Sequence, residues 1–516
     1  MNGISTPVRR VDAAAKAAGR AAYVSDISVE GLLYARTVRA LVARGRITAV
    51  SYPGMPEGYT VVDASDIPEK GKNTILMIED DWPVFATDEV RFYGQTIALL
   101  VGPDRSILEE LLAAVVVEYD SDPAPAVGTI EESESVIGGT AVHGSDNVFV
   151  DFTIEKGSWN QAETAAAQVI EEVFSTGFQE HVYMEPQGCM MLFEDEKLTL
   201  YASTQCPFYL QKSLANTLGL PKDEIRVKQA HTGGGFGGKE HYPDVLATAL
   251  GVAVVKTGAP IQFILERMED MEFTSKRHPS KITFRTALDE NGDILGMDVD
   301  IKLNAGAYIT CSSVVLQRTL FTVTGAYDIP SAKIRGRAFA TNIVPSDAFR
   351  GFGAPQALFA IEMHMDHLAA ESGSESIEYK ARYFQKKGDR TETGGTIYDE
   401  VLLGEMLERI EARSGYSLKR KSLPKGEGIG VSIFSHGCGF TGSGEQDIIK
   451  GRVTLEKSAD GVVRIGAAGV DMGQGLLTTF KKVVAGVLDL PLSKIVYERP
   501  DTDQVPNSGP TCASRS

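Results

Sequence analysis

The sequence predicts a mixed α/β (α+β) protein built from several domains. Strand-like and helix-like runs alternate along the whole chain, as they do in mixed folds. The 516 residues suggest about three domains, at roughly 150 residues per domain. A composition of 43% hydrophobic and 23% charged residues is ordinary for globular proteins and excludes a disordered or collagen-like chain.

The first region mixes strands with one helix. Aromatic and β-branched residues dominate positions 32–41 and 90–102, which predicts strands. Residues 106–120 predict a helix, because one face at helical spacing is apolar. That face consists of Ile107, Leu108, Leu111, Leu112 and Val115. Residues 121–147 are rich in Pro, Gly, Ser and Glu, which indicates a connection between domains.

The rest of the chain repeats this alternation in two further regions. In the second region we expect strands at 197–204, 224–230 and 260–266, and helices at 241–255 and 357–372. A further helix is expected at 400–413, before the third region, whose expected strands are 452–458, 462–470 and 494–501 and whose expected helix is 476–490. No repeat of solenoid length is present. We therefore place an N-terminal domain at 1–125, a linker at 126–147, a second domain at 148–415 and a third at 416–516.

Charge and cysteine content narrow the function classes. A net charge of −18 disfavours a nucleic-acid partner, because phosphate backbones repel a negative surface. No apolar run is long enough to span a membrane, and the first residues lack the apolar core of a secretory signal. The five cysteines share no short motif, which argues against a disulfide framework and against an iron–sulfur site. We expect a cytoplasmic protein, with an organelle transit peptide as the minor alternative.

A glycine-rich loop from His231 to Glu240 is the strongest local feature, between a predicted strand and a predicted helix. Five glycines in six positions allow the backbone to approach a ligand closely. Gly233, Gly235 and Gly238 match the dinucleotide pattern G-x-G-x-x-G, but the flanking elements do not repeat a clean βαβ unit. The phosphate-loop pattern fails, because Glu240 stands where it requires Ser or Thr.

Eight motifs in order give a third interpretation of this loop. They are the opening PVRRVDAAAKAAGRAAYVSDI, then GFQEHVYMEPQG, STQCPF, GGGFGGKE, QRTLF, SDAFRGFGAPQALFA, DMGQG and VPNSGPTCAS. Together the motifs resemble the molybdenum-binding subunit of the xanthine dehydrogenase/aldehyde oxidase family, closest to the xanthine dehydrogenase branch. The resemblance covers essentially the whole chain. It implies a small N-terminal α/β hammerhead-like domain followed by molybdopterin-binding domains, the second of them incomplete.

The resemblance also implies a set of cofactor-binding residues. The family binds molybdenum through a molybdopterin, in some members as its cytosine dinucleotide, and adds no metal-ligating side chain. Gln205, Phe236, Arg350 and Ala513 match positions around the molybdenum. The remaining matched cofactor positions are Gly234, Gly235, Gly473, Gln474, Gly475 and Cys512.

On the substrate side, the resemblance points to a polar pocket. Glu240 and Arg318 match positions that are charged in purine-oxidising members. A carboxylate and a guanidinium facing one cavity can hold a planar heterocycle and stabilise charge that develops on its ring. Phe352 and Phe440 match two aromatic residues that sandwich the ring, and Thr441 follows the second.

The implied activity is hydroxylation of a purine such as hypoxanthine or xanthine at an electron-poor ring carbon, with water as the oxygen source. Electrons would leave through [2Fe–2S] clusters and FAD on partner subunits, because this chain has no cysteine cluster and no clear flavin motif. Three alternatives stay open. They are a hydroxylase of another N-heteroaromatic such as nicotinate or of an aldehyde, a non-catalytic cofactor-binding or assembly subunit, and a dinucleotide-binding protein.

One family feature has no match. Family members carry a general-base glutamate in a Gly-Glu-Pro-Pro setting, and no Gly-Glu-Pro sequence occurs in these residues. We expect a second chain or a further segment to supply it, so the chain alone should lack turnover and be poorly soluble.

Overall fold

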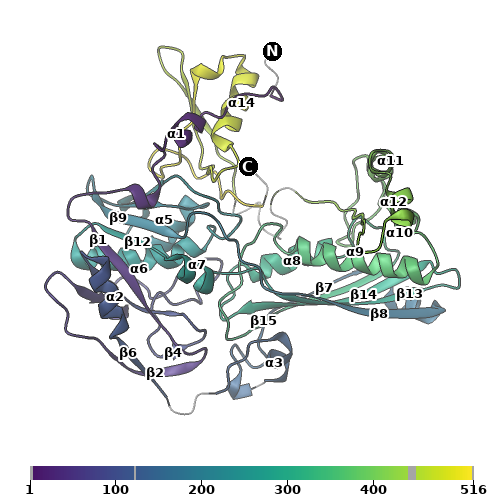
Figure 1. Cartoon of the computed structure of the whole chain (residues 1–516), viewed down its shortest axis with the longest axis horizontal. Coiled ribbons are helices and arrows are strands. Elements are labelled where there is room, and N and C mark those ends of the chain that lie inside the picture. The colour runs from purple at the N-terminus through teal and green to yellow at the C-terminus, as the bar shows by residue number, and fades with distance from the viewer. Residues whose placement is uncertain (1–3, 121–123, 137, 438, 440–448, 514–516) are drawn as a thin grey trace.

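A computed structural model describes residues 4–120, 124–136, 138–437, 439 and 449–513. Three parts are visible: a body built on a seven-stranded sheet, a wing built on a five-stranded sheet, and a small lobe (Figure 1). This arrangement confirms the prediction of a mixed, multidomain α/β fold. Within the described residues, no helix has the length and apolar character needed to cross a membrane.

The sheet of the body joins strands from the first two regions of the sequence. Its order is β11-β10-β9-β12-β1-β5-β3. The strands are Ile225–Gln229, Lys197–Ala202, Gly188–Glu194, Ile261–Ile264, Leu33–Arg39, Thr96–Gly102 and Thr60–Val62. The junction is the parallel pair of β1 with β12, in which Leu33 faces Ile261. The predicted N-terminal region and the region after it therefore share one hydrogen-bonded sheet.

Helices α5 (Pro207–Leu218) and α6 (Tyr242–Thr257) pack on this sheet. Nearly all of α6 is buried, which its apolar sequence explains, and Gly258 ends it with a φ of 68°. The short helix α7 (Arg267–Phe273) follows β12. Because α5 and α6 begin just after Gln205 and Glu240, the helix starts fix where these two side chains lie.

The predicted helix at 106–120 is shorter in the structure. Helix α2 runs over Arg105–Ala113, and β6 (Val116–Tyr119) then pairs with β2 (Gly45–Ser51), which also pairs with β4 (Glu89–Val90). Placing Val115 on the helix was therefore wrong, because the β-branched run from 115 to 117 favours extended backbone. Leu108 and Leu111 are buried as expected, whereas Ile107 is exposed.

The wing has the strand order β7-β15-β14-β13-β8. Its strands are Val148–Lys156, Ala332–Ala340, Ile294–Gly306, Ser280–Leu288 and Gln168–Thr176. Helices α8 (Ser312–Thr322) and α9 (Ala354–Glu371) cover one face of the sheet (Figure 1). The remaining helices are α4 (Trp159–Ala165), α10 (Ser376–Arg382), α11 (Leu403–Ser414) and α12 (Tyr416–Ser422).

The segment at 126–147 contains ordered structure. Helix α3 (Ile130–Ser135) starts with a capping box in which Thr129 and Glu132 exchange hydrogen bonds with each other's backbone N–H groups. Val127 and Val142 are buried together against β15. This segment packs on the wing as well as connecting two parts of the chain.

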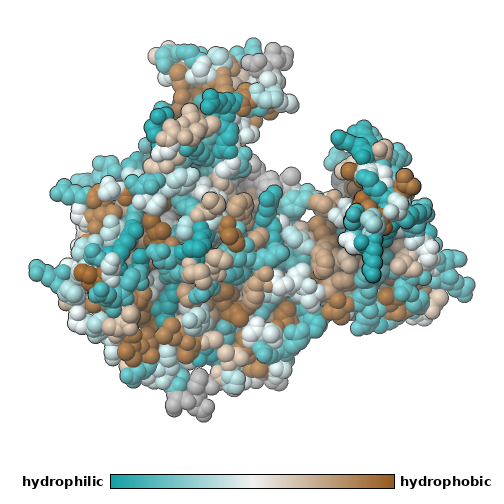
Figure 2. Space-filling model, in the orientation of Figure 1, coloured by the Kyte–Doolittle hydropathy of each residue, from teal (hydrophilic) through white to brown (hydrophobic). Residues whose placement is uncertain are grey.

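The lobe contains β16 (Thr454–Lys457), β17 (Val463–Gly466), β18 (Ile495–Val496) and α14 (Leu476–Leu488). The N-terminal helix α1 (Ala13–Ala17) lies beside α14, and the Val11 N–H donates to the Thr478 hydroxyl over 3.1 Å (Figure 1). In the space-filling view the lobe and the block formed by α10 to α12 stand apart, with open space between them (Figure 2).

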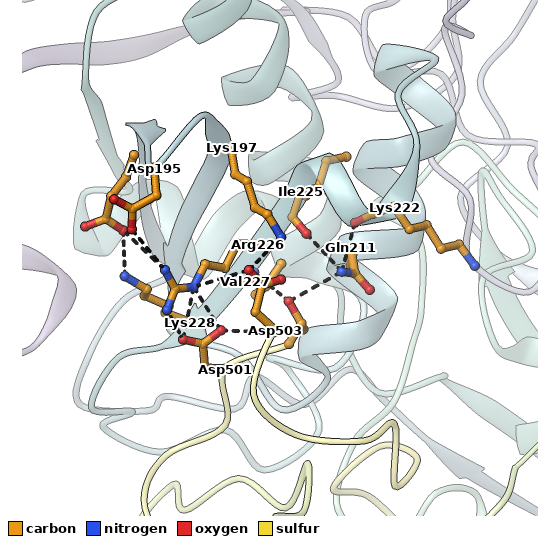
Figure 3. Close-up of polar contacts among 12 residues, drawn as sticks. Asp195, Lys197, Gln211, Lys222, Ile225, Arg226, Val227, Lys228, Asp501 and Asp503 are labelled. Atoms are coloured by element: carbon orange, nitrogen blue, oxygen red, sulfur yellow. Dashed lines mark hydrogen bonds and ion pairs between the residues drawn. The ribbon is translucent and has the colours of Figure 1, made fainter.

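Charged contacts join the segment after β18 to the edge strand β11 and its neighbour β10 (Figure 3). Asp501 accepts hydrogen bonds from the Arg226 guanidinium at 3.0 and 2.6 Å, and Lys197 donates to Asp503 at 2.8 Å. Thr502 exchanges hydrogen bonds with the backbone of Val227. These contacts hold the segment that leads into the loop at 505–513 against the body.

Candidate functional site

Body, wing and lobe meet around a cavity of about 580 Å³. Most of the predicted site residues line it: Gln205, Phe236, Glu240, Arg318, Arg350, Phe352, Gly473, Gln474, Cys512 and Ala513. Gly235 and Gly475 lie next to lining residues in the sequence, and Gly234 lies two positions before Phe236, without lining the cavity themselves. Phe440 and Thr441 lie outside the described residues.

The glycine loop presents its backbone to the cavity. Gly234 and Gly237 have φ angles of 97° and 102°, and Phe236 between them has a φ of 52°. Phe352 and Ala513, which also line the cavity, have φ angles of 52° and 51°. Left-handed backbone costs energy for residues other than glycine, and such strain concentrates at ligand sites. Three strained residues around one cavity therefore mark it as functional.

Gln205 links the glycine loop to the C-terminal segment. Its side-chain oxygen accepts from the Gly237 N–H over 2.9 Å, and its amide nitrogen donates to the Thr511 carbonyl over 3.0 Å. A Cβ at Gly235 would lie 2.5 Å from that oxygen and 2.9 Å from the Met472 sulfur. The φ of Gly235 is not positive, so its backbone conformation does not require glycine. Glycine is required here because a side chain would collide with Gln205 and Met472.

The lobe contributes a tight turn. Gly473 has a φ of 120°, and its N–H donates to Asp471 over 2.9 Å. The Gln474 side chain folds back on this turn, accepting from the Met472 N–H and donating to the Val470 carbonyl, both over 2.8 Å. Gly475 precedes the first turn of α14. The turn therefore lies at a helix N-terminus, which favours an anionic ligand such as a phosphate.

Glu240 is 3% exposed and lies at the inner end of the glycine loop. Burial raises the pKa of its carboxyl group to about 7, against the opposing effect of the neighbouring His241. Near neutral pH the group is therefore able to donate or to accept a hydrogen bond, which suits recognition of a heterocycle with both kinds of edge.

Arg318 is also 3% exposed and projects from α8. Its guanidinium donates to the carbonyls of Gly437 and Gly439, at 3.1 and 2.8 Å. The Gly439 N–H in turn donates to the Ala513 carbonyl over 2.8 Å. These hydrogen bonds connect the wing helix α8, the glycines at 437 and 439, and the C-terminal segment beside the cavity.

A buried polar cluster behind Glu240 was not predicted from the sequence. Asp347 accepts hydrogen bonds from His241 at 3.1 Å and from the Cys311 thiol at 2.6 Å. Burial opposes the charge of His241, but Asp347 raises the pKa of this imidazole to about 9. These residues are far apart in the sequence and match no spacing motif, so only the fold brings them together. The lining residues that were not predicted from the sequence are Gly237, Ala348, Phe349, Gly351, His436, Met472 and Thr511.

The cavity suits an organic cofactor that brings its own metal. Among the described residues, the one group of three potential metal ligands is His241, Cys311 and Asp347, and none of the three lines this cavity. The lining instead offers backbone amides, the side-chain amides of Gln205 and Gln474, and the Arg350 guanidinium. Such a donor set matches the ring nitrogens, oxygens and phosphate of a pterin cofactor.

Comparison with known families agrees with this geometry. Residues 142–384 and 405–516 each match a family described as molybdopterin cofactor-binding domain. Residues 18–123 match the aldehyde oxidase and xanthine dehydrogenase a/b hammerhead domain. The chain belongs to the xanthine dehydrogenase/aldehyde oxidase family. The domain boundaries given above stay predictions.

Relatives with this family's names match over nearly the full chain. Xanthine dehydrogenase from Oryza sativa is 31% identical over 533 residues, covering 99% of this chain and 38% of the relative. A Bacillus subtilis protein named as a probable xanthine dehydrogenase subunit is 29% identical, covering 99% of this chain and 68% of the relative. The chain thus spans less than half of the plant enzyme and about two thirds of the bacterial protein.

Solved structures show the same fold. An aldehyde oxidoreductase from Desulfovibrio gigas superposes with a TM-score of 0.86 at 26% identity, covering 99% of this chain and 57% of that chain. Quinoline 2-oxidoreductase from Pseudomonas putida gives a TM-score of 0.85 at 25% identity, covering 98% and 68%. One of these enzymes is named for aldehydes and the other for an N-heteroaromatic.

Proposed function

We propose that this chain binds molybdopterin in an oxidoreductase that hydroxylates a purine-like N-heteroaromatic. The observation that carries the proposal is that Glu240 and Arg318, both 3% exposed, line one cavity together with Phe352. A pocket for simple aldehydes needs no buried carboxylate and no guanidinium, so the presence of both beside one cavity favours a ligand with polar edges.

Gln205, Phe236, Gly237, Arg350, Gly473, Gln474 and Ala513 would hold the cofactor. When bound, the cofactor supplies the redox chemistry that oxidises the ring carbon. Glu240 would bind and orient the heterocycle through its ring nitrogens, Arg318 would stabilise negative charge on its oxygen, and Phe352 would pack on its face.

Partner chains or domains would carry the electrons onward. Of the described cysteines, Cys189, Cys206 and Cys311 are buried and Cys512 is partly exposed, and they lie on separate segments. We therefore propose [2Fe–2S] clusters and FAD on partners, as the name of the bacterial relative, a subunit, suggests. The pterin is proposed as molybdopterin or its cytosine dinucleotide, and the enzyme as cytoplasmic.

The test is a substrate panel with the enzyme assembled from this chain and its partners. We expect hypoxanthine or xanthine to be hydroxylated with ¹⁸O incorporated from labelled water, and aldehydes to react poorly. Glu240→Gln should remove purine turnover while molybdenum per chain stays unchanged. Equal purine turnover by the variant, or a clear preference for aldehydes, would contradict the substrate assignment.

A further inference from the structure

A second cavity, of about 610 Å³, adjoins the first. Glu240 and Phe352 border both cavities, so these two side chains lie where the two spaces meet. The far wall comes from the N-terminal region at 76–78, the start of α5, and the segments at 449–452 and 507–510. Its volume is in the range of cavities that hold small molecules.

The lining of this second cavity has an unusual charge. It includes the cations Lys212, Lys222, Lys450 and Arg452, all exposed, and among the described lining residues its one carboxylate is Glu240 at the inner end. The whole chain carries a net charge of −18, so four cations around one opening run against the overall bias. Composition alone does not account for this concentration of positive charge.

Two carboxylates of the segment after β18 are paired with cations other than these four. Asp501 and Asp503 bind Arg226 and Lys197, and the Lys222 side chain extends away from that network (Figure 3). Within the described residues, Lys212, Lys222 and Arg452 form no ion pair with any carboxylate. Their charge is therefore available to a ligand.

We call the opening lined by Lys212, Lys222, Lys450 and Arg452 the basic mouth. We propose that this basic mouth selects substrates that carry an anionic group, such as a carboxylate, at the end of the ring remote from the reacting carbon. The inference rests on the proposed function and names the substrate class more closely. Orientation follows from the charges, because an anion beside the Glu240 carboxylate would be repelled while one beside Lys212 and Arg452 is attracted. The ring then lies inward, against Phe352.

The test compares purine-6-carboxylate with purine-6-carboxamide, which are similar in shape and differ by one charge. Their kcat/KM values are measured with the assembled enzyme at about 10 mM and about 150 mM salt, because the Debye length shortens from about 30 to about 8 Å. The variant is the double charge reversal Lys212→Glu with Arg452→Glu. The matched control is Lys425→Glu, a reversal at an exposed lysine outside both cavities.

At low salt we expect the enzyme to prefer the carboxylate by about ten-fold, and the double reversal to abolish or invert this ratio. The control should keep the ratio. Equal ratios in the wild type and the double variant would overturn the proposal. If neither purine turns over, the proposed function fails, and equilibrium binding of the same two compounds to the molybdenum-loaded enzyme still decides the charge preference.

Discussion

The close approach of Gly235 to Gln205 gives a direct prediction about cofactor binding. In Gly235→Val, the new Cβ would lie 2.5 Å from the Gln205 side-chain oxygen, so this amide must move. Moving it breaks the hydrogen bonds from the Gly237 N–H and to the Thr511 carbonyl. At about 0.5 to 1.5 kcal/mol each, the loss is about 1 to 3 kcal/mol, which a folded domain tolerates.

The expected result is folded protein with a several-fold lower cofactor content, because the displaced amide and side chain intrude on the cavity. Molybdenum and pterin per chain are measured by mass spectrometry and by fluorescence of the oxidised pterin, with Tm recorded alongside. Gly177→Val is the matched control, since its Cβ would meet nothing within 4 Å. Equal cofactor content in the two variants would refute the role assigned to the glycine loop.

Three further predictions concern charge. Arg318→Met should lower kcat/KM for hypoxanthine by at least about ten-fold with unchanged molybdenum, because charge-assisted hydrogen bonds contribute about 1.5 to 3 kcal/mol; an unaffected rate would exclude Arg318 from substrate binding. Because the pKa of Glu240 is raised from 4.5 to about 7, its protonation stabilises the fold below pH 4.5, and this contribution is lost as pH rises through 7. In denaturant titrations, the free energy of unfolding of Glu240→Gln should therefore fall less between pH 4.5 and about pH 7 than that of the wild type. The same pH dependence in both proteins would contradict the raised pKa of Glu240. Asp501→Ala should cost about 2 kcal/mol in the same assay. Asp503→Ala should cost less than half as much, because the Asp503 carboxylate lies 2.8 Å from the more exposed Lys197 and only within 3.9 Å of Arg226.

Local sequence patterns predicted the elements well where one strong signal acted alone. Alternation and apolar faces located β10, β11, α6 and α9 to within a few residues. The predicted end of the helix at 106–120 was wrong because two signals compete there: apolar spacing favours helix and β-branched residues favour strand. Pairing of β6 with β2 makes this segment a strand. The sequence could not predict that the first two regions share the sheet of the body, because the pairing of Leu33 with Ile261 depends on tertiary packing.

At the site too, local features could be predicted from the sequence and contacts made by tertiary packing could not. The glycine loop was visible in sequence because its chemistry is local, and resemblance supplied the role suggested for Gln205. Asp347 and Cys311 gave no signal, because their contact with each other and with His241 arises only when α8 and the loop at 346–353 fold against the start of α6. The basic mouth went unnoticed for the same reason, as Lys212 and Arg452 lie 240 positions apart in the chain.

The most direct test of the account is the molybdenum and pterin content of the enzyme that contains this chain, purified from a host that makes molybdopterin. We predict close to one molybdenum and one pterin per chain, and a several-fold fall of both in Gly235→Val but not in Gly177→Val. Protein that is folded and assembled with its partners, yet free of molybdenum and pterin, would contradict the central claim that the cavity between body, wing and lobe is a molybdopterin site.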